Sequence, residues 1–159
     1  MKALLLFTLG ILIIPSFTLA ENFEISVTRK GPNIYKVEGK DVIIQTKYCY
    51  EYAYSEDAIL RSNGYLGDII FLDSAGKCSV KAIYGKSEQQ PGKYAVNVSL
   101  DEDDWYEIIG HDMYIKTYGC LNLSLGVDAI LSINSEGFGT LYIEDDRCMV
   151  EGIYSKLKF

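Results

Sequence analysis

Four cysteines are the residues best suited to covalent chemistry in this 159-residue chain. Cys49 and Cys78 are separated by almost the same length of sequence as Cys120 and Cys148. A zinc site or a redox centre would need closely spaced thiols, and no CxxC motif is present. In an exported chain, an even number of cysteines indicates disulfides. Of three possible connectivities, the matched spacing favours Cys49–Cys78 with Cys120–Cys148, each bridge contributing about 3–4 kcal/mol.

A row of tyrosines at alternate positions is the most conspicuous candidate binding feature. It consists of Tyr48, Tyr50, Tyr52 and Tyr54. On a β-strand these side chains would share one face. Such rings can stack on sugars or hold a peptide, but they can equally fill a core or an interface within the chain.

Clustered carboxylates are the other candidate binding residues, and they are Asp101, Glu102, Asp103 and Asp104. Acidic loops of exported proteins can hold calcium, but this cluster does not have the twelve-residue EF-hand spacing. A solvated acidic turn is therefore the preferred interpretation, and neither a metal nor a cofactor is predicted. His111 is the only histidine and lies in an expected turn, with no nucleophile and orienting acid in a recognisable pattern. We therefore predict no catalytic residues and no enzymatic activity.

The chain contains an internal duplication, and the candidate residues are positioned by the elements of its two copies. Residues 23–86 align with residues 94–156, with an offset of 71 that becomes 70 after a single one-residue gap at Gly76. Both copies contain a Thr-x-x-Cys motif, then Asp-Ala-Ile-Leu, then a basic residue followed by Cys-x-Val. Each copy therefore tests an interpretation made on the other.

The duplication favours burial of the tyrosine row. Tyr50, Tyr52 and Tyr54 align with Leu121, Leu123 and Leu125. Because aliphatic residues replace aromatic ones, we expect these faces to pack the two copies together, so that neither copy folds alone. Truncation of Leu123 to Ala would then cost about 2–5 kcal/mol. A ligand-binding face restricted to the first copy is the alternative. Trp105, which aligns with Ile34, is also expected in the core.

The hydrophobic pattern has a period of two, which predicts β-strands and no helix. Short strands are expected at 34–38, 58–61, 69–73 and 78–84, and longer ones at 42–54 and 113–125. The sequence thus predicts an all-β fold: a tandem duplication of a small disulfide-stapled antiparallel unit with about six strands per copy, packed as a sandwich or a barrel-like pair. The copies span 21–86 and 93–159, joined by a linker at 87–92.

The first twenty residues have the pattern of a signal peptide: Lys2, an apolar run, Pro15 and small residues before Glu21. We therefore expect a secreted or periplasmic protein with no membrane span after cleavage. The following residues 21–90 carry 9 basic and 10 acidic groups, whereas residues 91–159 carry 5 and 12. This acidic balance makes nucleic acid an unsuitable partner.

These features together predict a non-catalytic binding module. Its partner would be an envelope or secreted protein, in an inhibitory or immunity-like role, or a glycan, because a rigid disulfide-stapled frame can present binding loops. The alternative is an architectural envelope component that assembles through strand edges, and a hydrolase is a less favoured third possibility.

Overall fold

The computed structural model describes residues 21–62, 67–120 and 122–158. These residues form twelve β-strands and no helix, which confirms the predicted all-β class. The first copy contains β1 (Glu21–Gly31), β2 (Ile34–Val37), β3 (Val42–Lys47), β4 (Glu56–Ser62), β5 (Gly67–Phe71) and β6 (Lys77–Ser87). The second contains β7 (Gly92–Glu102), β8 (Trp105–Ile108), β9 (Met113–Tyr118), β10 (Val127–Ile133), β11 (Gly139–Ile143) and β12 (Asp146–Lys156). The predicted leader, residues 1–20, lies outside the described residues, which contain no helix able to span a membrane.

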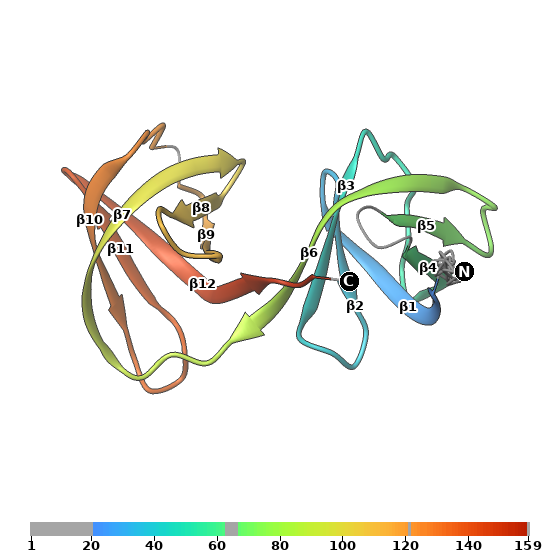
Figure 1. Cartoon of the computed structure of the whole chain (residues 1–159), viewed down its shortest axis with the longest axis horizontal. Coiled ribbons are helices and arrows are strands. Elements are labelled where there is room, and N and C mark those ends of the chain that lie inside the picture. Colours follow the sequence, from blue (N-terminus) through green and yellow to red (C-terminus); the bar gives the residue numbers. More distant parts are fainter. Residues whose placement is uncertain (1–20, 63–66, 121, 159) are drawn as a thin grey trace, which may run out of the picture.

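Each copy closes into a six-stranded antiparallel barrel. In the first copy β1, β2 and β3 form a meander, and β4 returns to pair with the other side of β1, which is a Greek-key arrangement. The ring closes because β4 pairs with β5, β5 with β6, and β6 with β3. Strands β7 to β12 repeat every one of these pairings. Figure 1 shows the two barrels side by side.

Alternation of side chains gives each barrel its own core. In β5, for example, Ile69 and Phe71 are fully buried, while Asp68 before them and Ile70 between them are only partly covered. Tyr35 packs inside the same barrel, with its ring centroid 5.2 Å from that of Phe71. Burial of one face per strand supplies the hydrophobic stabilisation of so small a unit.

The barrels are joined where β6 and β12 extend past their own rings and pair with each other. Gly85 lies opposite Ser155, its equivalent in the other copy, and Tyr84 and Tyr154 take equivalent places on either side of this point. The pairing therefore has approximate twofold symmetry, as an isologous interface between identical subunits would have. We call this region the joint.

Aromatic rings fill the joint. Tyr84 of β6 stacks on Trp105 of β8 at 4.7 Å between ring centroids, and Trp105 meets Tyr154 edge-on at 5.1 Å. Tyr114 of β9 meets Tyr84 at 5.0 Å. The burial expected for Trp105 is confirmed. The expectation that the tyrosine and leucine faces hold the copies together is wrong, because this separate aromatic cluster does so.

Candidate functional site

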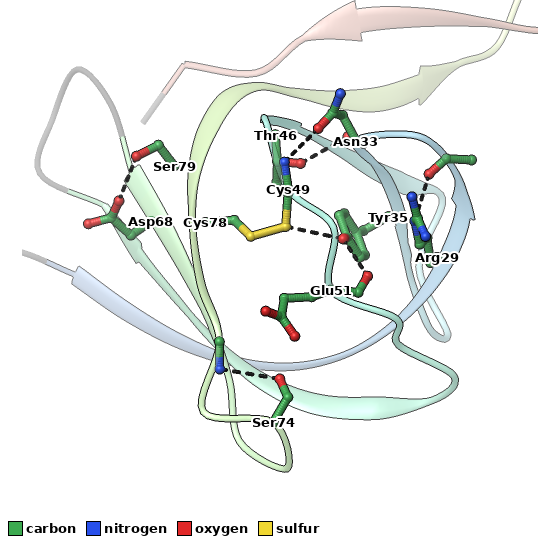
Figure 2. The surroundings of a disulfide bond; sticks show 12 residues. Arg29, Asn33, Tyr35, Thr46, Cys49, Glu51, Asp68, Ser74, Cys78 and Ser79 are labelled. Carbon is green, nitrogen blue, oxygen red and sulfur yellow. Dashed lines mark hydrogen bonds between the residues drawn. A yellow bond between two sulfur atoms is a disulfide. The ribbon is translucent and has the colours of Figure 1, made fainter.

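The first disulfide fixes the start of the tyrosine row. Cys49, which follows β3, is bonded to Cys78 on β6, as predicted. The buried hydroxyl of Tyr35 lies 3.1 Å from the Cys49 Sγ atom and donates a hydrogen bond to the backbone carbonyl of Glu51, at 2.7 Å. Figure 2 shows the disulfide and the Tyr35 ring within the ring of strands. The chain after β3 is therefore anchored to the barrel interior at two nearby points.

The second barrel has the same anchor. Cys120 is bonded to Cys148, which confirms the predicted connectivity, and the Tyr106 hydroxyl donates to the carbonyl of Asn122 at 2.7 Å. Burial raises the pKa of both Tyr35 and Tyr106, which favours the protonated phenol that donates these hydrogen bonds. No sequence motif assigns a role to this tyrosine pair, although its recurrence at equivalent positions of the two copies is a signal of a shared one.

A polar side chain at the preceding hairpin completes each anchor. The Asn33 Oδ1 atom accepts a hydrogen bond from the Cys49 amide at 2.8 Å, and the Asp104 Oδ1 atom accepts one from the Cys120 amide at 3.0 Å. Because Asn and Asp both offer an acceptor oxygen here, the substitution between copies preserves the contact.

The tyrosine row is not part of a strand, contrary to the predicted long strand at 42–54. Strand β3 ends at Lys47, because Tyr48 has a left-handed backbone with φ of 49°. Ser55, just after the row, also has φ of 49°. In the second copy the equivalent positions are Gly119 and Gly126, with φ of 62° and 67°. Glycine is the residue that adopts this conformation without strain.

Between these two residues the backbone of the row is held against the barrel. The Ala53 carbonyl accepts a hydrogen bond from the Arg29 amide at 2.9 Å, and the Ser55 amide donates one to the Thr28 Oγ1 atom at 2.9 Å. Cys49 and Ala53 point inward and are buried. The row is therefore an extended but fixed segment across which buried and exposed side chains alternate.

All four tyrosines point into solvent, so the preferred prediction of burial is wrong. Their exposed fractions are 87% for Tyr48, 83% for Tyr50 and 79% for both Tyr52 and Tyr54. The residues between them occupy the interior side of the segment, and the disulfide determines which side that is. This exposure is what the alternative prediction, a ligand-binding face restricted to the first copy, requires, and the binding of a ligand there stays a prediction.

The aligned leucines are exposed as well. Leu123 and Leu125 have exposed fractions of 83% and 85%, and Leu121 lies outside the described residues. The equivalence seen in the sequence therefore reflects a shared outward position and not a shared core. The second barrel presents one nearby exposed aromatic residue, Tyr118 at 66%.

Carboxylates of the acidic cluster form ion pairs and hydrogen bonds in the joint and within their own hairpin. Lys81, from the first barrel, lies 2.6 Å from the Glu102 carboxylate and 3.7 Å from that of Asp101. Gln45 also donates a hydrogen bond to the Glu102 carboxylate, at 2.8 Å. Asp104 pairs with Lys116 at 3.6 Å in addition to capping Cys120. These contacts assign internal roles to three of the four carboxylates.

Asp103 is exposed, as is Asp101, and forms the tight turn after β7, with φ of 49°. Within residues 21–62, 67–120 and 122–158, no three potential metal ligands lie close enough together to hold an ion. His111 is exposed in a turn, as expected. The tyrosine row is therefore the strongest candidate site among the residues selected from the sequence.

Comparison of the chain with protein families, with curated proteins and with solved structures finds no match. The two disulfides indicate an oxidising, extracellular-type compartment. The interpretation of the site rests on its own geometry.

Proposed function

We propose that this chain is an exported, non-catalytic binding module that acts in the secreted or periplasmic space and captures its partner through the tyrosine row. The observation that supports this proposal is the exposure of four tyrosines on a backbone fixed by a disulfide and by hydrogen bonds. Exposed aromatic side chains that share one segment are unusual on a monomer surface and are typical of interaction sites.

The physical properties of tyrosine suit this role. Its ring has two side-chain torsions, so ordering it on binding costs little entropy, and its hydroxyl can hydrogen-bond while the ring excludes water. The fixed backbone lowers the ordering cost further. Both an exported protein and an envelope glycan offer surfaces that such a row can engage.

Backbone strain adds support. The first copy keeps a tyrosine and a serine at two left-handed positions where the second copy has glycines. Such strained residues cluster at functional sites in proteins. Assembly through strand edges, the alternative function, gains no similar support, because every strand described here pairs on both sides within a closed ring.

Photo-crosslinking tests the proposal. A photoreactive phenylalanine analogue replaces Tyr52 in one variant and Met149 in the control, since Met149 is also exposed but lies on β12 of the second barrel. In the native envelope fraction we expect a discrete adduct from position 52 only. The adduct is identified by mass spectrometry, and its purified partner is titrated with the Tyr50→Ser and Tyr52→Ser variants.

We expect each substitution to weaken binding about 30-fold, as at an interface hot spot, while Tyr118→Ser changes the affinity less than about twofold. Equal adducts from positions 52 and 149, or unchanged affinity in both row variants, would refute the proposal. Sedimentation of large homogeneous assemblies of the chain alone would favour the architectural alternative instead.

A further inference from the structure

A cavity opens into the second barrel at one end. Its volume is about 210 Å³. The larger apolar residues around it are Tyr94, Val96, Ile108, Met113, Leu131 and Ile153. Two polar side chains, Gln89 and His111, also line it. Mouths of β-barrels are common places for small-molecule sites.

The cavity is an outward continuation of the barrel core. Ile108, Leu131 and Ile153 belong to the buried core cluster of this barrel, whereas Val96 and Met113 are packed against that cluster and remain partly exposed. Apolar surface left facing water is unfavourable by roughly 25 cal/mol per Å². An apolar group placed here would remove that surface from water.

The two barrels differ in the chain that passes this end. In the first barrel Leu157, beyond β12, donates its amide to the carbonyl of Ile83 at 2.8 Å and lays its side chain against Gly85. Ile83 is the equivalent of Ile153. In the second barrel the equivalent of Leu157 is Ser87, which pairs with Ile153, and the polar linker 88–91 that follows it brings Gln89 to the cavity. Polar residues therefore lie at this end of the second barrel where the first barrel has a leucine.

A polar depression adjoins the cavity. It shares Gln89 and Ile153 with the cavity and has a volume of about 490 Å³. Its charged residues are Lys86 and three carboxylates, Asp41, Glu88 and Glu136. Because the acidic groups outnumber the basic one, the depression disfavours an anionic group and suits a polar head that is uncharged or cationic.

We propose that the mouth of the second barrel binds a small amphipathic molecule: an aromatic ring or short alkyl chain with a polar head that carries no negative charge. A cavity of about 150 Å³ accommodates benzene, so 210 Å³ admits a ring with a short substituent. The ring would lie against Val96 and Met113, and the head would lie in the depression beside Lys86. This site is distinct from the tyrosine row and does not depend on the proposed function.

Methyl NMR tests the proposal directly, because residues 21–159 contain only two methionines, Met113 at the cavity and Met149 on the surface. The probe is 2-phenylethanol, titrated into the methyl-labelled protein. We expect a saturable shift of the Met113 methyl signal and no shift of the Met149 signal. Hexanoate, whose head is anionic, is expected to bind more weakly than hexanol, whereas hexylamine, whose head is cationic, should bind no more weakly than hexanol.

Matched variants use the duplication. Val96→Phe fills the cavity and should weaken binding of 2-phenylethanol about tenfold or more, whereas Ile25→Phe, at the equivalent position of the first barrel, should leave it unchanged. The Met149 signal reports whether each variant is folded. If Val96→Phe does not fold, Gln89→Trp covers the opening from the linker without altering a strand. Absence of a saturable Met113 shift, equal shifts at both methionines, or full affinity in the filled variant would overturn the proposal.

Discussion

The segments that follow the third strand of each barrel, residues 48–55 and 119–126, have similar backbones and different surfaces. Both begin and end with left-handed residues and both are anchored by a disulfide and a buried tyrosine hydroxyl. One presents four exposed tyrosines, and the other presents exposed leucines. The two copies therefore share the same anchor and differ in the side chains that the anchored segment exposes to solvent.

The two segments also differ in the conformational energy of their backbones. A non-glycine residue in the left-handed region carries a penalty of roughly 1–2 kcal/mol. The second barrel avoids it with Gly119 and Gly126, whereas the first bears it at Tyr48 and Ser55. The first barrel thus retains side chains at positions where the fold alone would favour glycine.

The largest loss of stability is expected from a substitution in the joint, which the two barrels share. Trp105→Ala removes the ring that contacts Tyr84 and Tyr154. We expect it to lower the free energy of unfolding by about 3–5 kcal/mol and to separate the unfolding of the two barrels into two transitions in denaturant titrations. Met149→Ala, on the exposed surface, should change stability by less than about 0.5 kcal/mol. A loss below about 1 kcal/mol for Trp105→Ala would show that the aromatic cluster does not couple the barrels.

The disulfides test whether the anchors are equivalent. Replacing Cys49 and Cys78 by alanine, or Cys120 and Cys148, should destabilise the protein by about 3–4 kcal/mol in each case. The two costs should agree because the bridged separations are 29 and 28 residues. Chemical denaturation of each double variant measures them. If the two costs differ by more than about 1 kcal/mol, one disulfide contributes more to the stability of its barrel than the other does.

An alkaline titration tests the burial of Tyr84 in the joint. Burial raises the pKa of Tyr84 above the ordinary tyrosine value of 10.0. Since the folded state binds this proton more tightly than the unfolded state, the stabilisation is complete below pH 10 and falls as pH rises further. Tyr84→Phe should reduce this alkaline loss.

At neutral pH the same variant should cost about 1 kcal/mol, since the Tyr84 hydroxyl donates a hydrogen bond to Gln45. Tyr50→Phe, on the exposed row, is the control and should leave stability at neutral pH unchanged. An unchanged alkaline slope in Tyr84→Phe would contradict the assignment.

Exchanging the left-handed residues sharpens the comparison between the two segments. Tyr48→Gly should stabilise the fold by about 0.5–1 kcal/mol, since relief of strain exceeds the added entropy of the unfolded chain. Gly119→Tyr should destabilise it by a similar amount. Thermal unfolding of both variants measures this, and partner affinity should fall in Tyr48→Gly despite its higher stability. Loss of stability in Tyr48→Gly would show that this side chain supports the fold.

The smallest expected effect corrects the prediction made from the sequence. Leu123→Ala should cost less than about 0.5 kcal/mol, because Leu123 is exposed and has little packing to lose. Leu131→Ala, in the core of the same barrel, should cost about 2–5 kcal/mol. A large cost for Leu123 would restore the buried interface that its alignment with Tyr52 first indicated.

The sequence contained enough information for the strands and the disulfides. Alternation of apolar residues predicts half-buried strands, and duplicated spacing selects one cysteine pairing from three. The sequence also argues against the long strand at 42–54. Gly119, which aligns with Tyr48, indicates a position with a left-handed backbone, and a strand cannot continue through it. The joint was not predictable in this way, since Trp105 and Tyr84 come from non-equivalent positions and meet only through tertiary packing.

The short connection between the barrels has a consequence for how strong the joint must be. Four residues, 88–91, separate β6 from β7. A tether this short holds tethered partners at a millimolar effective concentration. A joint with an intrinsic dissociation constant near 1 mM, equivalent to about −4 kcal/mol, would therefore already be about half closed. Cutting the tether by protease should release two folded barrels that reassociate only at high protein concentration.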